Sequence, residues 1–266
     1  MFDDTRNHNQ RVLVTRVYNN RGYMDQLEGR NVVIEALRRR RRQVRKIFLD
    51  ERSKNNWKIT ELLQLISDQN IKLERVDRQK LDKMSETGVH NGVIAVAEPL
   101  PVYTLKQLLD EIYAKDEFPF LVLADEIQYE QNLGAILRSA MGAGVHGVIV
   151  PKVRGKGLSA VVQRVSMGGS EEVPLIREGL SSAIKTLKKE GIPIVAADMD
   201  GRPVWDVNLK GALAVILGGE SKGVSPTLRN KSDRIISVPL QNNLDSLNVS
   251  VTAGIIFFEK CRQESL

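Results

Sequence analysis

Three short polar clusters in the C-terminal half of the chain combine residue types that could do chemistry. The first is Asn132-Leu-Gly-Ala-Ile-Leu-Arg138, the second is Gly218-Gly-Glu-Ser-Lys-Gly223, and the third is Gln241-Asn-Asn-Leu-Asp-Ser-Leu-Asn248. An arginine can hold a phosphate or stabilise a developing oxyanion, and glycines allow a ligand to lie against the backbone. The clusters are therefore candidates for a binding or catalytic site.

Each cluster also has an ordinary structural explanation. In the helix expected over Asn132–Ala143, the apolar residues share one face and Arg138 points away from it, as a solvated arginine does. Glu220 could favour the N-terminus of a following helix through the helix dipole. Ser246 and Asn248 are residue types that commonly cap helices. Taken singly, none of the clusters defines a function.

The elements that must position these clusters alternate along the second part of the chain. Near-continuous apolar strands, separated by helices, are expected at Phe120–Ala124, Gly147–Val150, Ile192–Ala197, Ala212–Leu217 and Ile235–Val238. This alternation predicts an α/β fold with a parallel sheet that helices cover on both faces. The second and third clusters each follow one of these strands, and open α/β sheets bind ligands outside the carboxyl ends of their strands. We therefore expect a pocket where these two strands end.

Two phosphate-binding motifs are excluded by their context. Gly142–Gly147 matches the pattern Gly-x-Gly-x-x-Gly, but a helix precedes it and a strand follows it, which is the reverse of a dinucleotide-binding fingerprint. Gly218–Gly223 lacks the Gly-Lys-Ser/Thr sequence that holds phosphate and magnesium in a P-loop. The glycines therefore indicate a different kind of ligand site.

The chain divides into four parts. Residues 1–24 are polar and without periodicity, so we expect a flexible basic arm. Residues 25–98 carry short apolar strands and amphipathic helices, which predicts a small α/β domain. Two prolines in the segment Glu98-Pro-Leu-Pro break regular structure, so residues 99–117 are expected to link this domain to a second one over residues 118–266.

Composition limits the partners and the compartment. Residues 1–100 hold 20 Lys and Arg against 14 Asp and Glu, whereas the rest of the chain holds 19 of each. The basic front part suggests a polyanion such as nucleic acid, although a solvated surface is the alternative. A single cysteine excludes an intrachain disulfide, and the three histidines have no metal-ligand spacing. This spacing predicts that the protein holds no metal. No apolar run reaches the length of a membrane span or forms a signal peptide, so we expect a cytoplasmic protein.

Together, and in this order, the three clusters resemble the three motifs of the SpoU/TrmH family in the SPOUT superfamily of RNA ribose 2′-O-methyltransferases. The matching segments are NLGAILRSA, LGGESKG and ISVPLQNNLDSLNVSVTAGI. Before them, LEGRNVVIEAL, a basic stretch and VHNGVIAVAEP look like the L30e-like substrate-binding domain of members that act on ribosomal RNA. The departures are small: Val238 stands where isoleucine is common, and the loop after Leu240 is rich in asparagine.

The resemblance implies a bent S-adenosylmethionine bound within a deep trefoil knot, at roughly Leu213–Glu259. By motif position, the residues around the cofactor would be Gly218, Gly219, Val238, Leu240 and Leu247. The catalytic positions would be Asn132, Arg138, Glu220, Ser246 and Asn248. Because a guanidinium is a very weak base, Arg138 is expected to stabilise the developing alkoxide or hold a neighbouring phosphate.

The implied partners are RNA and a second copy of the chain. The resemblance suggests a guanosine of 23S ribosomal RNA as the substrate, and the basic run Arg38–Arg42 with Arg45 and Lys46 would grip the RNA. Family catalytic sites form at a dimer interface, which agrees with a final helix, VSVTAGIIFFEK, that is apolar nearly all the way round. The alternatives are a transfer-RNA ribose methyltransferase, a non-catalytic ribosome-assembly protein and an α/β enzyme that acts on a small nucleotide.

Overall fold

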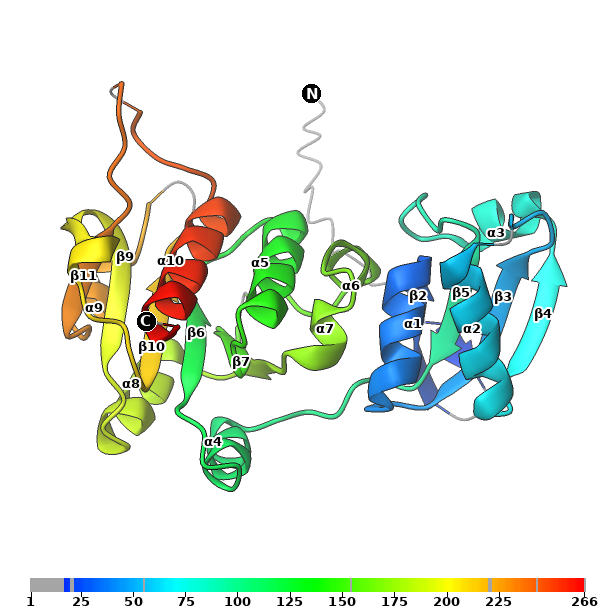
Figure 1. The fold of residues 1–266 in the computed structure, drawn as a ribbon, viewed down its shortest axis with the longest axis horizontal. Helices are drawn as coiled ribbons and strands as arrows, with labels where there is room; N and C mark the ends of the chain where they lie inside the picture. Colours follow the sequence, from blue (N-terminus) through cyan, green and yellow to red (C-terminus); the bar gives the residue numbers. More distant parts are fainter. Residues whose placement is uncertain are drawn as a thin grey trace, which may run out of the picture.

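The chain forms two α/β units joined by a connecting segment that carries helix α4 (Leu105–Tyr113), as Figure 1 shows. This computed structural model describes residues 17–19, 22–54, 56–153, 155–219, 222–242 and 244–265. None of the helices in these ranges is long and apolar enough to cross a lipid bilayer. The same residues contain no group of three His, Cys, Asp or Glu side chains arranged to hold a metal ion.

The N-terminal unit is built on a five-stranded mixed sheet in the order β1-β2-β5-β3-β4. Its strands are β1 (Val17–Asn19), β2 (Gly22–Glu28), β3 (Val44–Asp50), β4 (Lys72–Val76) and β5 (Val93–Ala97). Its helices are α1 (Arg30–Arg39), α2 (Trp57–Asp68) and α3 (Arg78–Met84). The apolar faces of α1 and α2 pack with β3 and β5 in one core, so this unit buries a core of its own.

One expectation for this unit needs correction. The polar arm expected over residues 1–24 contains strand β1 and the start of β2, whereas residues 1–16, 20 and 21 lie outside the described residues. Strands β1 and β2 pair antiparallel, from Val17 opposite Met24 to Asn19 opposite Gly22. Backbone pairing forms these strands, and such pairing leaves no apolar periodicity in a polar sequence.

The C-terminal unit is built on a six-stranded sheet in the order β11-β9-β10-β6-β7-β8, in which every pair is parallel. Its strands are β6 (Phe120–Ala124), β7 (Gly147–Val150), β8 (Leu175–Arg177), β9 (Ile194–Pro203), β10 (Leu213–Leu217) and β11 (Arg234–Ser237). Its helices are α5 (Glu130–Gly142), α6 (Ala160–Val165), α7 (Gly169–Glu172), α8 (Leu180–Lys189), η1 (Val204–Asp206), α9 (Pro226–Arg229) and α10 (Val249–Glu264). The α/β class and the parallel sheet are confirmed, and the trefoil knot stays a prediction.

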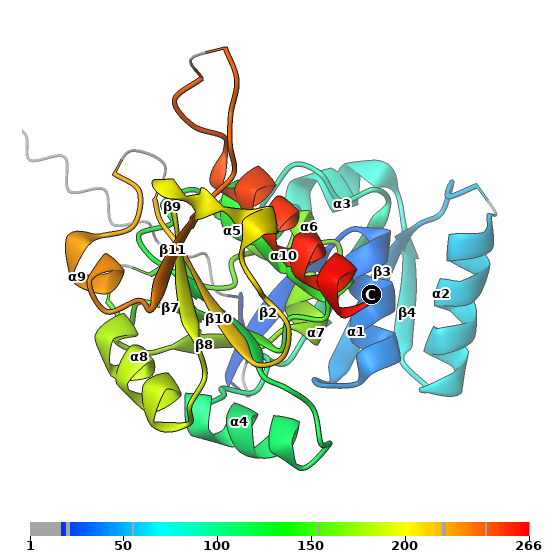
Figure 2. The ribbon, with the colours of Figure 1, turned by 60° about the vertical axis from the view of Figure 1, so that its left-hand side comes forward.

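Helices cover both faces of this sheet, as Figure 2 shows. Helices α5, α6 and α10 pack in one core, and α4 and α8 pack in another on the opposite face. The central strands β6 and β10 are buried at every position, which explains their unbroken apolar sequences.

Helix α10 is buried along one stripe only, and not all the way round as its sequence predicts. Its buried apolar residues are Val249, Ala253, Ile256 and Phe257. On another face, Val251 is 49% exposed and Phe258 is 52% exposed. One chain leaves this apolar surface exposed, so only a partner molecule could bury it.

The two units meet through a buried ion pair. The Arg42 guanidinium donates to Asp25 Oδ2 at 2.8 Å within its own unit, and to Glu171 Oε2 at 3.1 Å and Gln163 Oε1 at 2.5 Å across the boundary. The side chains of Arg42 and Glu171 are fully inaccessible to solvent. This arginine therefore contributes to the joint between the units.

The same geometry corrects the expectation that Arg42 grips RNA, because its side chain is buried. Ion pairs within the chain join Arg38 to Glu35 and Glu61, Arg39 to Glu35 and Glu172, Arg45 to Glu98 and Lys46 to Glu74. Arg41 donates to the backbone carbonyls of Glu171 and Glu172. Most of the run is therefore paired inside the protein, which a count of charges along the sequence does not reveal.

Candidate functional site

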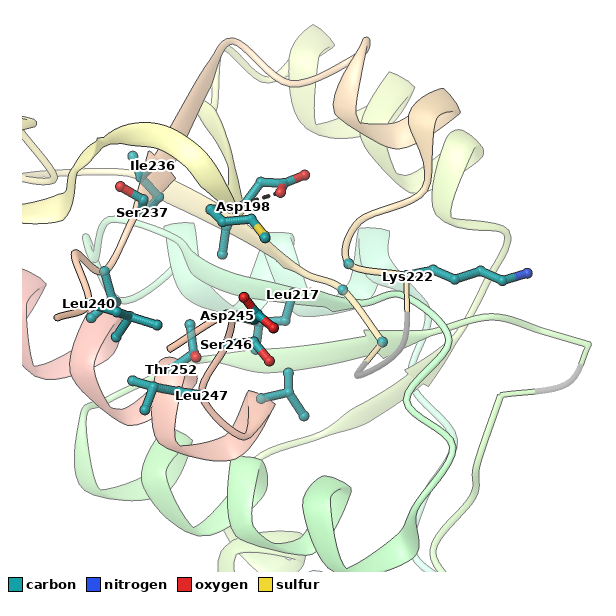
Figure 3. Close-up of a pocket in the computed structure, with 17 residues that line it drawn as sticks. Asp198, Leu217, Lys222, Ile236, Ser237, Leu240, Asp245, Ser246, Leu247 and Thr252 are labelled. Carbon is teal, nitrogen blue, oxygen red and sulfur yellow. Dashed lines mark hydrogen bonds between the residues drawn. The ribbon is translucent and has the colours of Figure 1, made fainter. Parts of the chain in front are cut away.

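A cavity of about 420 Å³ opens at the carboxyl ends of β10 and β11 and beside the middle of β9, as Figure 3 shows. This is a suitable size for a small ligand, since such pockets commonly span ~300–1,000 Å³. Six of the ten residues expected from the sequence line it: Gly218, Gly219, Val238, Leu240, Ser246 and Leu247. The structure therefore brings the second and third clusters together where the sheet topology predicts.

The glycine cluster turns sharply at the end of β10. A Cβ atom on Gly218 would lie 2.0 Å from the carbonyl carbon of Gly223, and one on Gly219 would lie 2.9 Å from the Glu126 carbonyl oxygen. The Gly223 amide donates to the Gly219 carbonyl at 2.9 Å, and Gly223 has a φ of +63°. The loop can take this shape only without side chains at its first two positions.

A second contact ties this loop to the neighbouring strand. The backbone amide of Ser225 donates to Asp125 Oδ2 at 2.9 Å, and Asp125 follows β6 directly and is buried. The Asp125 amide in turn donates to the carbonyl of Leu217, the last residue of β10, at 2.8 Å. These bonds hold the pocket wall on two adjacent strands, so its shape is set before a ligand arrives.

Asn132 and Asn248 lie together although 116 positions separate them. The Asn248 Nδ2 atom donates to Asn132 Oδ1 at 3.1 Å. The Asn248 Oδ1 atom also accepts from the backbone amide of Ser250 at 2.9 Å, so Asn248 caps helix α10. The capping explanation therefore holds for Asn248, and the same side chain also joins the first cluster to the third.

Arg138 and Glu220 stand apart from this arrangement. Arg138 lies on α5 with an exposed side chain, and it does not line the cavity. In the described part of the chain, its guanidinium has no hydrogen-bond or ion-pair partner. Glu220 lies outside the described residues. One chain thus supplies the ligand pocket without bringing the expected catalytic arginine into it.

Several polar residues of the cavity were not expected from the sequence. The cavity is also lined by the polar residues Asp198, Lys222, Asp245 and Thr252, and by Met199. In Figure 3, Asp245 and Ser246 lie close together, whereas the Lys222 side chain extends away from them. Asp198 accepts from Arg229 at 3.0 Å. The Arg229 guanidinium also holds the pKa of Asp200 below its usual value, so this arginine connects two carboxylates.

The order of the strands in the sheet explains why the sequence did not predict all the residues that line the cavity. Strand β9 pairs with both β10 and β11, so Asp198, near the carboxyl end of the strand's pairing with β10, joins the pocket. Nothing in the sequence states which strands are neighbours. Asp245 sits next to Ser246 in a loop already identified, so it could have been found as part of that loop.

Comparison with known proteins decides the family. A model of the SpoU rRNA Methylase family matches residues 119–258, and a model described as RNA 2′-O ribose methyltransferase substrate binding matches residues 26–103. The 23S rRNA (guanosine-2′-O-)-methyltransferase RlmB of Escherichia coli K12 is 36% identical over 244 residues, which span 91% of this chain and 99% of that protein.

The chain belongs to the SpoU rRNA methylase family. This membership confirms the resemblance and the expected enzyme class, an S-adenosylmethionine-dependent RNA methyltransferase.

Two solved structures place the SpoU fold of this chain. The SpoU methyltransferase AviRb of Streptomyces viridochromogenes, in complex with the cofactor AdoMet, has a TM-score of 0.71 at 24% identity, over 90% of each chain. The A. aeolicus TrmH/SpoU tRNA modifying enzyme has a TM-score of 0.50 at 26% identity, and covers 60% of this chain and 84% of that chain. The tRNA enzyme therefore matches a much smaller share of this chain.

The pocket residues suit S-adenosylmethionine, the cofactor of the SpoU family. Apolar side chains at Val238, Leu240 and Leu247 can pack against a nucleoside, and the glycine loop offers backbone groups. The carboxylates of Asp198 and Asp245 are oxygen acceptors for ribose hydroxyls and favour a nearby positive charge. When bound there, the cofactor supplies an electrophilic methyl group on a sulfonium.

Proposed function

We propose that this protein methylates the ribose 2′-hydroxyl of a guanosine in 23S ribosomal RNA. The observation that carries the proposal is similarity to RlmB over 99% of that protein's length, which includes the substrate-binding part as well as the methyltransferase part. A transfer-RNA substrate is the second candidate, and it is less favoured because the tRNA modifying enzyme matches only 60% of this chain.

The proposed division of labour follows the two units. Residues 25–98 would bind RNA, residues 99–117 would link the units, and residues 118–266 would transfer the methyl group. Ribosomal RNA as the substrate supports a cytoplasmic location.

Within the methyltransferase domain, the cofactor-binding role is proposed for Gly218, Gly219, Val238, Leu240 and Leu247. The polar positions Asn132, Glu220, Ser246 and Asn248 would hold the ribose, the cofactor or the catalytic arginine in place. The bond between Asn132 and Asn248 supports this assignment, because it fixes two of these side chains beside the pocket.

Arg138 is proposed as the residue that stabilises the reacting ribose oxygen. The 2′-hydroxyl attacks the methyl carbon in line with the departing sulfur, and its proton must leave as the new bond forms. A guanidinium near this oxygen favours the developing negative charge. The exposed position of Arg138 outside the cavity supports its delivery to the pocket of another chain.

A homodimer would unite the parts that one chain keeps separate. The exposed apolar residues Val251 and Phe258 lie on α10, which packs against α5, the helix that carries Arg138. A second copy that covers this face would bury its apolar surface and complete the site.

Methyl transfer to purified RNA tests the proposed function. The protein would be incubated with labelled S-adenosylmethionine and either unmodified 23S ribosomal RNA or unmodified transfer RNA, followed by mapping of the modified nucleotide. Label at one guanosine ribose of 23S RNA is the expected result. Label in transfer RNA alone would favour the second candidate, and no label in either RNA with cofactor bound would favour a non-catalytic assembly protein.

A further inference from the structure

A second cavity, of about 600 Å³, lies in a cleft between the two domains. Its walls are the N-terminus of α1, the segment between β3 and α2, and helix α6 of the methyltransferase domain. The basic residues that line it are Arg30, Arg52, Lys54, Lys58, Arg78 and Arg164. Both domains therefore contribute positive charge to one cleft.

The two carboxylates of this cleft, Glu28 and Asp50, are buried and accept hydrogen bonds from within the N-terminal unit. Glu28 accepts from Ser85 Oγ at 2.8 Å and from the Thr87 amide at 3.2 Å, and Asp50 accepts from the Arg52 amide at 2.9 Å. Among the residues that the structure describes, the side chains of Arg52, Lys54 and Arg78 form no ion pair. These cations contrast with the paired arginines Arg38, Arg39 and Arg42, and they are free to bind an external anion.

Two polar atoms in the walls of this cleft lack partners. Arg164 Nε and Ser53 Oγ are the buried side-chain nitrogen and oxygen atoms without a hydrogen bond in the described part of the chain. Both residues line the cleft. Buried donors are nearly always satisfied, so two unpaired polar atoms on residues that line one cleft favour a ligand with acceptor oxygens there.

An exposed aromatic residue lies beside these cations. Trp57 is the first residue of α2 and is 69% exposed, and the Lys58 ammonium lies 5.2 Å from its ring centre. Lys58 also donates to Asn31 Oδ1 at 2.7 Å, so it is held between the cleft and the ring. An exposed indole beside positive charge is a platform on which an unpaired base can stack.

We infer that this cleft binds an unpaired segment of the substrate RNA, with phosphates on Arg52, Lys54 and Arg164 and a base stacked on Trp57. The inference rests on the proposed function, and it names the surface of the protein that would bind the substrate RNA. Helix α6, which carries Arg164, packs against both β2 and α5 (Figure 1). RNA held in the cleft is thereby tied to the domain that carries Arg138.

Binding to a hairpin fragment of 23S RNA, measured over a range of salt concentrations, tests the phosphate contacts. The triple variant Arg52→Ala, Lys54→Ala and Arg164→Ala should lower the slope of log affinity against log salt by about 2, since each phosphate contact contributes roughly 0.7–0.9. The matched control is Lys185→Ala with Lys189→Ala, which removes exposed charges on α8 and should leave the slope nearly unchanged.

Trp57 tests the stacking contact separately. Trp57→Ala should weaken binding to the hairpin roughly tenfold without a change of salt slope, and Trp57→Phe should restore most of the affinity. A fully paired duplex, which offers no unpaired base, should show no effect of Trp57→Ala. An equal effect on hairpin and duplex would overturn the stacking assignment.

Different experimental results would contradict the inference about the cleft and the proposed function. If wild-type protein methylates 23S RNA but the triple variant keeps its salt slope and its KM for RNA, the inference about the cleft is wrong and the function stands. If wild-type protein methylates no RNA although it binds the cofactor, the proposed function fails first. Unchanged cofactor affinity and melting temperature of each variant would show that the fold is intact.

Discussion

At the scale of single residues, three arginines with the same chemistry have three different surroundings. Arg42 is fully buried between carboxylates, Arg138 is exposed on α5, and Arg164 has a buried Nε without a partner. The environment of each arginine, and not its residue type, distinguishes the structural ion pair of Arg42 from the candidate RNA contacts of Arg138 and Arg164. In the sequence, Arg42 looks like part of an RNA grip, and only its surroundings show otherwise.

Arg138→Ala tests the proposed catalytic role. Turnover should fall at least about 100-fold, because a group that stabilises charge in the transition state is lost. Affinity for S-adenosylmethionine should stay within a factor of about two, because Arg138 does not line the pocket. Single-turnover methyl transfer and calorimetric titration measure the two quantities, and loss of cofactor binding would contradict the assignment.

Glu28 gives a pH dependence of stability. Burial would raise its pKa, but hydrogen bonds from Thr87, Ser85 and Gln26 outweigh burial and lower it below the usual 4.5. A lowered pKa stabilises the fold above the unfolded value, and this contribution is lost as the pH falls through the folded value. Wild type should therefore exceed Glu28→Gln in stability by roughly 1–3 kcal/mol at neutral pH. Urea unfolding should show this difference shrink below about pH 4.5, and a constant difference would contradict the account.

At the scale of elements, the site depends on loops at the carboxyl ends of parallel strands. The apolar runs of β6, β7 and β10 were predicted nearly residue by residue, because strands buried on both faces leave an unmistakable sequence. Helix α3 and strand β8 were missed. The former is polar over most of its length and the latter has three residues, so neither leaves a clear period.

The site was predictable to the extent that its residues share a loop or a motif. Gly218, Gly219 and Leu247 could be placed from the strand before each loop. Asp198 could not, because its membership depends on β9 being the neighbour of β10 and β11, which is a property of the assembled sheet. The burial of Arg42 could not be predicted for the same reason, since its partners Glu171 and Gln163 lie in a distant segment.

Gly218→Ala tests the loop after β10. The new Cβ would overlap backbone atoms of Gly223 and Val224, so the loop must shift and cofactor affinity should fall about tenfold or more. Gly179→Ala is the matched control, because its Cβ would meet nothing closer than 4.0 Å and its φ is an ordinary −65°. Calorimetric titration checks both variants, and full affinity in Gly218→Ala would count against this pocket.

The uncovered face of α10 gives a test of the proposed dimer. Phe258→Glu should place a charge in the interface and shift the protein to monomers at micromolar concentration, while Phe258→Leu should keep the dimer. Sedimentation velocity distinguishes the two states. A wild-type protein that is already monomeric would sink the proposal, and so would a Phe258→Glu variant that remains dimeric.

At the scale of the whole molecule, a buried ion pair orients the substrate-binding domain on the methyltransferase domain. The contacts of Arg42 with Glu171 and Gln163 cross the boundary, and its contact with Asp25 anchors it in the substrate-binding domain. This arrangement lets one RNA touch both domains, so the joint affects the substrate path as well as stability.

Arg42→Met tests this joint. Removing the cation leaves Glu171 buried without its partner, which should cost about 3–5 kcal/mol of unfolding free energy. Arg38→Met is the control, because it breaks partly exposed ion pairs within one domain and should cost about 1 kcal/mol or less. Chemical denaturation gives both values, and equal losses in the two variants would contradict the special role of the buried pair.

The most direct test of the central claim uses two synthetic fragments of 23S RNA that differ by one oxygen atom. One carries a normal guanosine at the mapped position, and the other carries 2′-deoxyguanosine. Methyl transfer from labelled S-adenosylmethionine should reach the first fragment and be absent from the second, because the acceptor oxygen is missing. Equal labelling of both fragments would place the methyl group on the base or elsewhere, and would contradict ribose 2′-O-methylation by this protein.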